Sequence, residues 1–123
     1  MSKKVVLIGH CGPDASYLRI AVMKAIKDVS ILTAHDDSSL DKLIDAGADL
    51  VLLNRQLEYG FSTDEGVAMI QRLREKYPQL KMMLVSNYPE AQEAAVKAGA
   101  LLGFGKGQIG KREVVDQLQA AVS

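Results

Sequence analysis

Apolar and polar residues alternate along the chain with two different periods. Five short segments are apolar almost throughout, which is typical of strands buried on both faces of a sheet; they are residues 5–9, 29–34, 49–53, 81–86 and 100–104. The segments between them carry apolar residues three and four positions apart, the spacing of one helix face; these are residues 15–27, 38–46, 65–77, 90–98 and 111–122. The pattern predicts five strands, each followed by a helix.

Proline and glycine residues stand at the expected ends of several helices. Pro13 and Pro89 come where two helices begin, and a missing backbone N–H costs nothing there. Pro78 ends the third helix, because proline cannot continue one. Gly47 and Gly99 follow two other helices and suit the left-handed conformation of a helix C-terminus. Turn chemistry and periodicity therefore agree on the helix ends.

The strict alternation of strands and helices indicates the fold class. Neighbouring parallel strands need a crossover connection, which a helix provides. We therefore predict an α/β fold, a three-layer αβα sandwich with helices on both faces of a parallel five-stranded sheet. No linker, repeat or low-complexity segment interrupts the pattern, so residues 1–123 are expected to form a single domain.

The composition argues against some classes of binding partner. The 15 basic and 15 acidic side chains cancel, so the chain has no basic footprint for nucleic acid or an anionic membrane surface. No apolar stretch approaches the ~20 residues that cross a bilayer, and no signal-peptide pattern opens the sequence. The single cysteine, Cys11, excludes an internal disulfide. We expect a cytoplasmic protein that binds neither nucleic acid directly nor membrane.

Ligands of an open parallel sheet bind at the carboxyl ends of its strands. Gly9 and His10 come at the end of the first predicted strand, and Asn54 at the end of the third. Ser86 ends the fourth strand, and Lys106 follows the fifth. These five residues are the first candidates for a functional site.

Three segments in this framework resemble the receiver domains of response regulators. They are Ala48-Asp49-Leu50-Val51-Leu52-Leu53-Asn54, Met83-Leu84-Val85-Ser86-Asn87, and Ala98-Gly99-Ala100 followed by Lys106. The similarity spans essentially the whole chain. It implies a flavodoxin-like (βα)5 fold with strand order 2-1-3-4-5 and a role in phosphorelay signal transduction in a two-component system.

The resemblance also implies a site, and this sequence only partly supplies it. In the family, an acidic pair after strand 1 binds a divalent metal, and an aspartate ending strand 3 accepts the phosphoryl group. A Ser/Thr and a lysine then contact that group, and Ser86 and Lys106 match them. Gly9 and His10 stand at the acidic pair, and Asn54 stands at the phosphoacceptor.

Further departures lie around the fifth strand and the loop after the third. Gly107 replaces the proline that often follows the lysine, and the usual aromatic position aligns with Gly103, which leaves Phe104 one place out of register. The loop from Asn54 to Gly66 is a few residues longer than usual. These departures concern the chemistry of the site and leave the predicted fold unchanged.

The substitutions remove the chemistry that phosphorylation needs. The Asn54 amide has no charge and its nitrogen lone pair is delocalised, so it cannot form an acyl phosphate. Magnesium needs hard anionic oxygen ligands. The formal charge of the family's site is about −2 before metal binds, whereas Lys106, His10 and Asn54 together give this pocket about +1. We therefore predict a degenerate pseudo-receiver that is not an enzyme and has no cofactor. We expect its magnesium binding to be lost or weak and the domain to be held in one conformation.

Two alternatives remain open for the site. The first is a working receiver with an atypical acceptor, either Asp14, which we expect mainly to favour the dipole of the first helix, or Asp64 in the extended loop. The second is a small α/β domain that binds an anion through Gly12, Lys106 and backbone N–H groups. His10 and Cys11 are too few for a zinc site and, as sequence neighbours, are poorly placed as a catalytic pair.

Partner binding is expected on two surfaces. The resemblance implies that a protein partner or a second copy docks on the face formed by helix 4, strand 5 and helix 5, which would include Glu90, Gln92, Glu93, Lys97, Lys111 and Gln117. Leu57, Tyr59 and Phe61 in the extended loop either form an exposed apolar patch or, as we favour, fold back onto the sheet edge.

Overall fold

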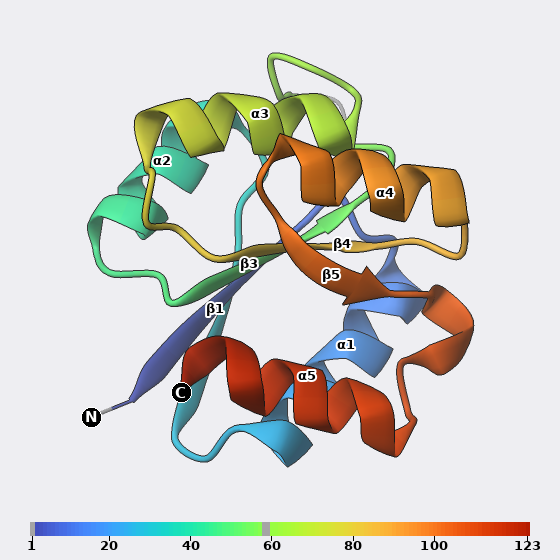
Figure 1. Cartoon of the computed structure of the whole chain (residues 1–123). Helices are drawn as coiled ribbons and strands as arrows, with labels where there is room; N and C mark the ends of the chain where they lie inside the picture. The colour runs from blue at the N-terminus through green and yellow to red at the C-terminus, as the bar shows by residue number, and fades with distance from the viewer. Residues whose placement is uncertain (1, 58–59) are drawn as a thin grey trace.

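A computed structural model describes residues 2–57 and 60–123 (Figure 1). Five strands alternate with five helices along these residues. The strands are β1 (Lys3–Ile8), β2 (Val29–Thr33), β3 (Leu50–Asn54), β4 (Met82–Val85) and β5 (Leu101–Phe104). The helices are α1 (Gly12–Ala25), α2 (Asp37–Asp45), α3 (Gly66–Lys76), α4 (Pro89–Ala98) and α5 (Arg112–Val122). A short 3-10 helix, η1 (Lys106–Gln108), follows β5 and was not predicted.

All strand pairs are parallel, and the sheet order is β2-β1-β3-β4-β5. Helices α1 and α5 cover one face of the sheet, and α2, α3 and α4 lie on the other (Figure 1). This three-layer, flavodoxin-like arrangement confirms the predicted fold class and strand order. Because the order reverses between β1 and β3, their carboxyl ends border the crevice where such sheets bind ligands.

The sheet is buried on both faces, which explains the continuous apolar runs of the sequence. Val5 and Leu7 of β1 face the core under α1 and α5, whereas Val6 and Ile8 face the core under the other helices. Strand β3 divides its side chains between the two cores in the same way. The central strands therefore form a rigid base that fixes where their terminal residues lie.

Strand β5 contains a bulge at the edge of the sheet. Met83 of β4 pairs with Leu101, yet Val85 pairs with Phe104, so β5 has one extra residue between these pairs. A side chain on Gly103 would collide with the carbonyl of Leu84, and glycine avoids that collision. The bulge turns Phe104 into the core under α1 and α5.

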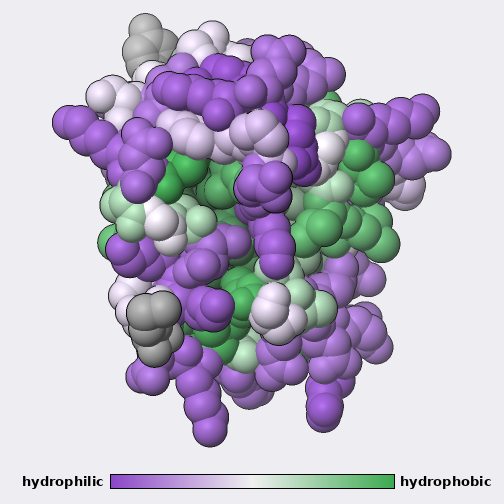
Figure 2. All heavy atoms as spheres, turned by 60° about the vertical axis from the view of Figure 1, so that its left-hand side comes forward, coloured by the Kyte–Doolittle hydropathy of each residue, from purple (hydrophilic) through white to green (hydrophobic). Residues whose placement is uncertain are grey.

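The side of the molecule that Figure 2 shows is largely hydrophilic. Figure 2 shows one side of the molecule, where polar side chains cover most of the surface and hydrophobic ones gather in smaller patches between them. Among the described helices, none is long and apolar enough to cross a membrane.

Candidate functional site

Asn54 is the last residue of β3 and lies at the centre of the candidate site. Its Nδ2 donates a hydrogen bond of 2.8 Å to the carbonyl of Gln56, two residues on. Its Oδ1 is buried and has no donor among the residues that the structure describes. The position expected to carry a phosphoacceptor therefore holds a neutral amide that is oriented by its own loop.

Leu57 fills the space beside the position of the acidic pair. Gly9 is buried with φ of 79°, and a Cβ at Gly9 would lie 2.7 Å from Leu57 Cδ2 and 3.1 Å from the carbonyl oxygen of Gln56. Leu57 is itself buried, so this part of the extended loop folds back, as we favoured. A carboxylate on residue 9 would meet both steric overlap and an unfavourable backbone conformation.

His10 points back toward the sheet. Its Nε2 lies 2.9 Å from the carbonyl oxygen of Leu52 in β3, within hydrogen-bond distance. The imidazole therefore acts as a bridge between the end of β1 and the middle of β3. Tyr59, which we had considered with Leu57 for an apolar patch, lies outside the described residues, and Phe61 is partly buried.

Lys106 has a carboxylate neighbour that the sequence did not lead us to expect. Its Nζ lies 3.2 Å from Asp14 Oδ2 in the first turn of α1. Burial alone raises the pKa of Asp14, but hydrogen bonds from the Cys11 thiol and from Lys106, with the Lys106 charge, hold that pKa below its ordinary value. The excess of about +1 expected for Lys106, His10 and Asn54 is therefore offset locally by Asp14.

Ser86 and Asn87 hold the end of β4 in place. Ser86 is buried, and its Oγ accepts a hydrogen bond of 3.2 Å from the backbone N–H of Tyr88. Asn87 Oδ1 accepts one of 3.2 Å from the N–H of Gly107, which ties this loop to η1. Ser86 is thus used as a structural hydroxyl in this conformation.

The structure brings some of the predicted site residues together and separates others. Asn54, Ser86 and Lys106 line one cavity of about 380 Å³. Asp64 lines an adjoining cavity of about 640 Å³. Gly12 is exposed on α1 and lines neither.

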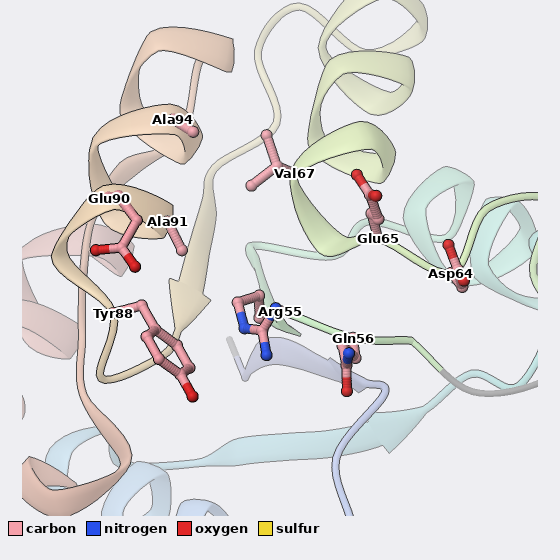
Figure 3. Close-up of a pocket in the computed structure, with 9 residues that line it drawn as sticks. All are labelled: Arg55, Gln56, Asp64, Glu65, Val67, Tyr88, Glu90, Ala91 and Ala94. Carbon is pink, nitrogen blue, oxygen red and sulfur yellow. The ribbon is translucent and has the colours of Figure 1, made fainter.

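Sequence reasoning missed two residues of the site, Arg55 and Tyr88. Both line the two cavities, and the Arg55 guanidinium carbon lies 4.7 Å from the centroid of the Tyr88 ring (Figure 3). A basic residue directly after Asn54 and an aromatic two positions after Ser86 were the only signals in the sequence. The contact itself could not be foreseen, because it joins two different loops.

The donor set offers little to a metal ion. Within residues 2–57 and 60–123, no three His, Cys, Asp or Glu side chains are grouped so that they could hold one. Asp14 is the acidic residue that follows the end of β1, where the family has its metal-binding pair, and its carboxylate forms an ion pair with Lys106.

The comparisons with known proteins support the fold. No protein-family model and no curated protein matches the sequence. A putative response regulator from Chloroflexus aurantiacus J-10-fl superposes with a TM-score of 0.76 at 15% identity, covering 99% of this chain and 98% of that one. The signal receiver domain of a DNA-binding response regulator (merR) from Colwellia psychrerythraea 34H gives 0.74 at 15% identity, with 98% of both chains covered. The receiver domain of NtrX from Brucella abortus gives 0.66 at 23% identity, again with 98% of both covered. This chain thus has the fold that response-regulator receiver domains have.

Proposed function

We propose that this chain is a receiver-type signalling module that acts by contact with other proteins and is not phosphorylated by the aspartyl mechanism. The observation that carries the proposal is the amide of Asn54 at the end of β3, hydrogen-bonded to Gln56 and unable to accept a phosphoryl group. The domain is cytoplasmic, is not an enzyme and needs no cofactor.

A second observation supports the loss of the metal site. The family places a magnesium-binding acidic pair at Gly9 and His10, but here Leu57 packs against Gly9 and His10 contacts the Leu52 carbonyl. Magnesium also requires oxygen ligands, and the carboxylate of Asp14 is already paired with Lys106. Charge that arrives by phosphorylation cannot bias the conformation of this domain, so its docking surface is permanently displayed.

The test is incubation with a small-molecule phosphodonor and magnesium, followed by intact-mass measurement. We expect no increase by the mass of a phosphoryl group. An adduct mapped to Asp14 or Asp64 would establish the alternative of a working receiver with an atypical acceptor. Asp14→Asn and Asp64→Asn are the matched controls for such an adduct.

The variant Asn54→Asp distinguishes the loss of the phosphoacceptor from the loss of the metal site. It restores an acceptor carboxylate but leaves Gly9, His10 and Leu57 unchanged. We expect it to remain unmodified under the same conditions, because the metal that neutralises the incoming phosphoryl charge still lacks the acidic pair that would bind it. Efficient modification of Asn54→Asp would show that the metal site is intact and would overturn that part of the proposal.

The face formed by α4, β5 and α5 is the proposed contact surface for a protein partner or a second copy. Val96, Leu101 and Leu102 are exposed there, and Leu102 is the most exposed at 64%. Two residues that we expected to belong to this surface also have a role in the fold. Gln92 and Gln117 both donate hydrogen bonds to backbone carbonyls of the sheet, so the apolar residues and not these amides support docking.

A further inference from the structure

Two cavities meet between the loop after β3 and the loop after β4. The smaller, of about 380 Å³, is lined by Asn54, Ser86 and Lys106. The larger, of about 640 Å³, extends toward α3 and α4 and is lined by Val67, Ala91 and Ala94 among others. Arg55, Gln56 and Tyr88 line both cavities. The two spaces therefore share one wall and form parts of one site.

Arg55 and Tyr88 form the middle of this site. Figure 3 shows the guanidinium group of Arg55 lying between the Tyr88 ring on one side and Gln56 on the other. Among the described residues the Arg55 side chain makes no ion pair, and its guanidinium carbon lies 4.7 Å from the centroid of the Tyr88 ring. Its guanidinium has five N–H donors in a planar fork, which matches the oxygens of a phosphate.

The smaller cavity favours a phosphate group. Among the residues that the structure describes, its charged lining residues are Arg55 and Lys106, and none of them is a carboxylate. Lys106 gives one donor to Asp14 and keeps two. A phosphate has three acceptor oxygens, enough to accept from both cations at once, whereas a carboxylate has two.

The larger cavity favours a positively charged group on the same ligand. Asp64, Glu65 and Glu90 line it; the first two come from the segment just before α3 and Glu90 comes from α4 (Figure 3). Val67, Ala91 and Ala94 give it an apolar wall. A ligand body that carries an amine would meet carboxylates at its rim and apolar surface along its length.

We propose that this site binds a small phosphomonoester that carries an amine, noncovalently, with the phosphate beside Arg55 and Lys106 and the amine beside Glu65 and its acidic neighbours. The inference rests on the proposed function, because a receiver-type module that cannot be phosphorylated needs another input. Binding joins the loop after β3 to the loop after β4, next to α4 of the proposed docking face.

The test is a titration of the isotope-labelled protein with glucosamine 6-phosphate, followed by backbone-amide NMR. Glucose 6-phosphate, which lacks the amine, and glucose, which lacks both charges, are the matched probes. We expect saturable shifts at residues 54–56, 86–88 and 106, with the tightest binding for glucosamine 6-phosphate and none for glucose. Arg55→Gln and Lys106→Gln should each weaken binding about tenfold, equivalent to about 1.4 kcal/mol.

Further variants test which side chains contact the phosphate of the ligand and which contact its amine. Arg112→Gln removes a cation from an exposed side chain of α5, away from both cavities, and should leave binding unchanged. Glu65→Gln should weaken glucosamine 6-phosphate by roughly two- to fivefold without affecting glucose 6-phosphate. Amide spectra of each variant report whether it remains folded.

Three outcomes would overturn the inference. These are no saturable shift with glucosamine 6-phosphate at millimolar concentration, equal binding of the amine-bearing and amine-free phosphates, or unchanged binding in both Arg55→Gln and Lys106→Gln. A covalent adduct in the mass experiment would overturn the proposed function and leave this noncovalent binding in place, so the two failures are distinguishable.

Discussion

Leu57 and Gly9 interlock, because a Cβ on Gly9 would lie 2.7 Å from Leu57 Cδ2. The glycine also has φ of 79°, which other residues adopt only with strain. The long loop after β3 can fold back onto the end of β1 only because residue 9 has no side chain. The change at the acidic pair and the longer loop are therefore two parts of one structural feature.

Gly9→Ala should destabilise the protein by about 1–3 kcal/mol, through backbone strain and displacement of Leu57. Urea unfolding measures the change. Gly110→Ala is the control, since nothing lies within 4 Å of its Cβ position and its φ is not positive. Equal stability of Gly9→Ala and the wild-type protein would contradict the interlocking of Leu57 and Gly9.

The alternation of strands and helices was predictable because both faces of the sheet are buried. That burial makes the strands apolar throughout, and the helix stripes follow from the same cores. The positions of Asn54, Ser86 and Lys106 at one cavity were predictable for a related reason, since parallel strands end at the same edge. These features depend on local pattern and topology alone.

Contacts between loops were not predictable. The pairing of Lys106 with Asp14 joins η1 to α1, and the stacking of Arg55 on Tyr88 joins two other loops. Neither pair has a fixed sequence spacing. Gly103 was noted only as a missing aromatic, but the structure shows that it permits the bulge that turns Phe104 inward. A single glycine does not specify which neighbour needs the space.

Gln92 stabilises the bulged edge of the sheet and should be sensitive to substitution. Its Nε2 donates to the carbonyls of Leu84 at 2.9 Å and Ser86 at 3.1 Å, and its Oε1 accepts from the N–H of Gly103 at 3.2 Å. Gln92→Ala should cost about 1–3 kcal/mol, because these backbone groups lose their partners.

Gln92→Glu should destabilise at least as much at neutral pH, since it places a carboxylate against two carbonyl oxygens. Thermal unfolding of both variants provides the measurement. The exposed neighbour Glu93, changed to alanine, should stay within about 0.5 kcal/mol of the wild type. If Gln92→Ala matched Glu93→Ala, Gln92 would be an ordinary surface residue.

Asp41 should make stability depend on pH. Burial alone raises its pKa, but the hydrogen bond from Lys76 and the charge of Arg72 outweigh burial and hold the pKa below the ordinary 3.8. A carboxyl with a depressed folded-state pKa stabilises the protein above its unfolded-state pKa, and this contribution is lost as the pH falls through the folded-state value.

The difference in unfolding free energy between the wild type and Asp41→Asn should therefore be largest near neutral pH and shrink as the pH falls through the lowered folded-state pKa of Asp41. Urea unfolding across this range tests it. Asp116→Asn, which breaks only an exposed pair with Arg112, should change stability little at any pH. A constant difference for Asp41→Asn would mean that its charge does not contribute.

Leu102 separates the proposed docking role of the α4–β5–α5 face from a role in folding. It is 64% exposed on the edge strand, so Leu102→Glu should leave the unfolding midpoint nearly unchanged. Met23 on α1 is exposed to nearly the same extent, at 65%, and lies outside the α4–β5–α5 face, which makes Met23→Glu a matched control. If the face joins two copies, sedimentation should show a dimer for the wild type and Met23→Glu and a monomer for Leu102→Glu, because a carboxylate at the centre of an apolar contact loses its hydration. If Met23→Glu dissociated the dimer and Leu102→Glu did not, the contact surface would lie on α1 instead. A new charge disrupts a dimer only where the interface buries that charge.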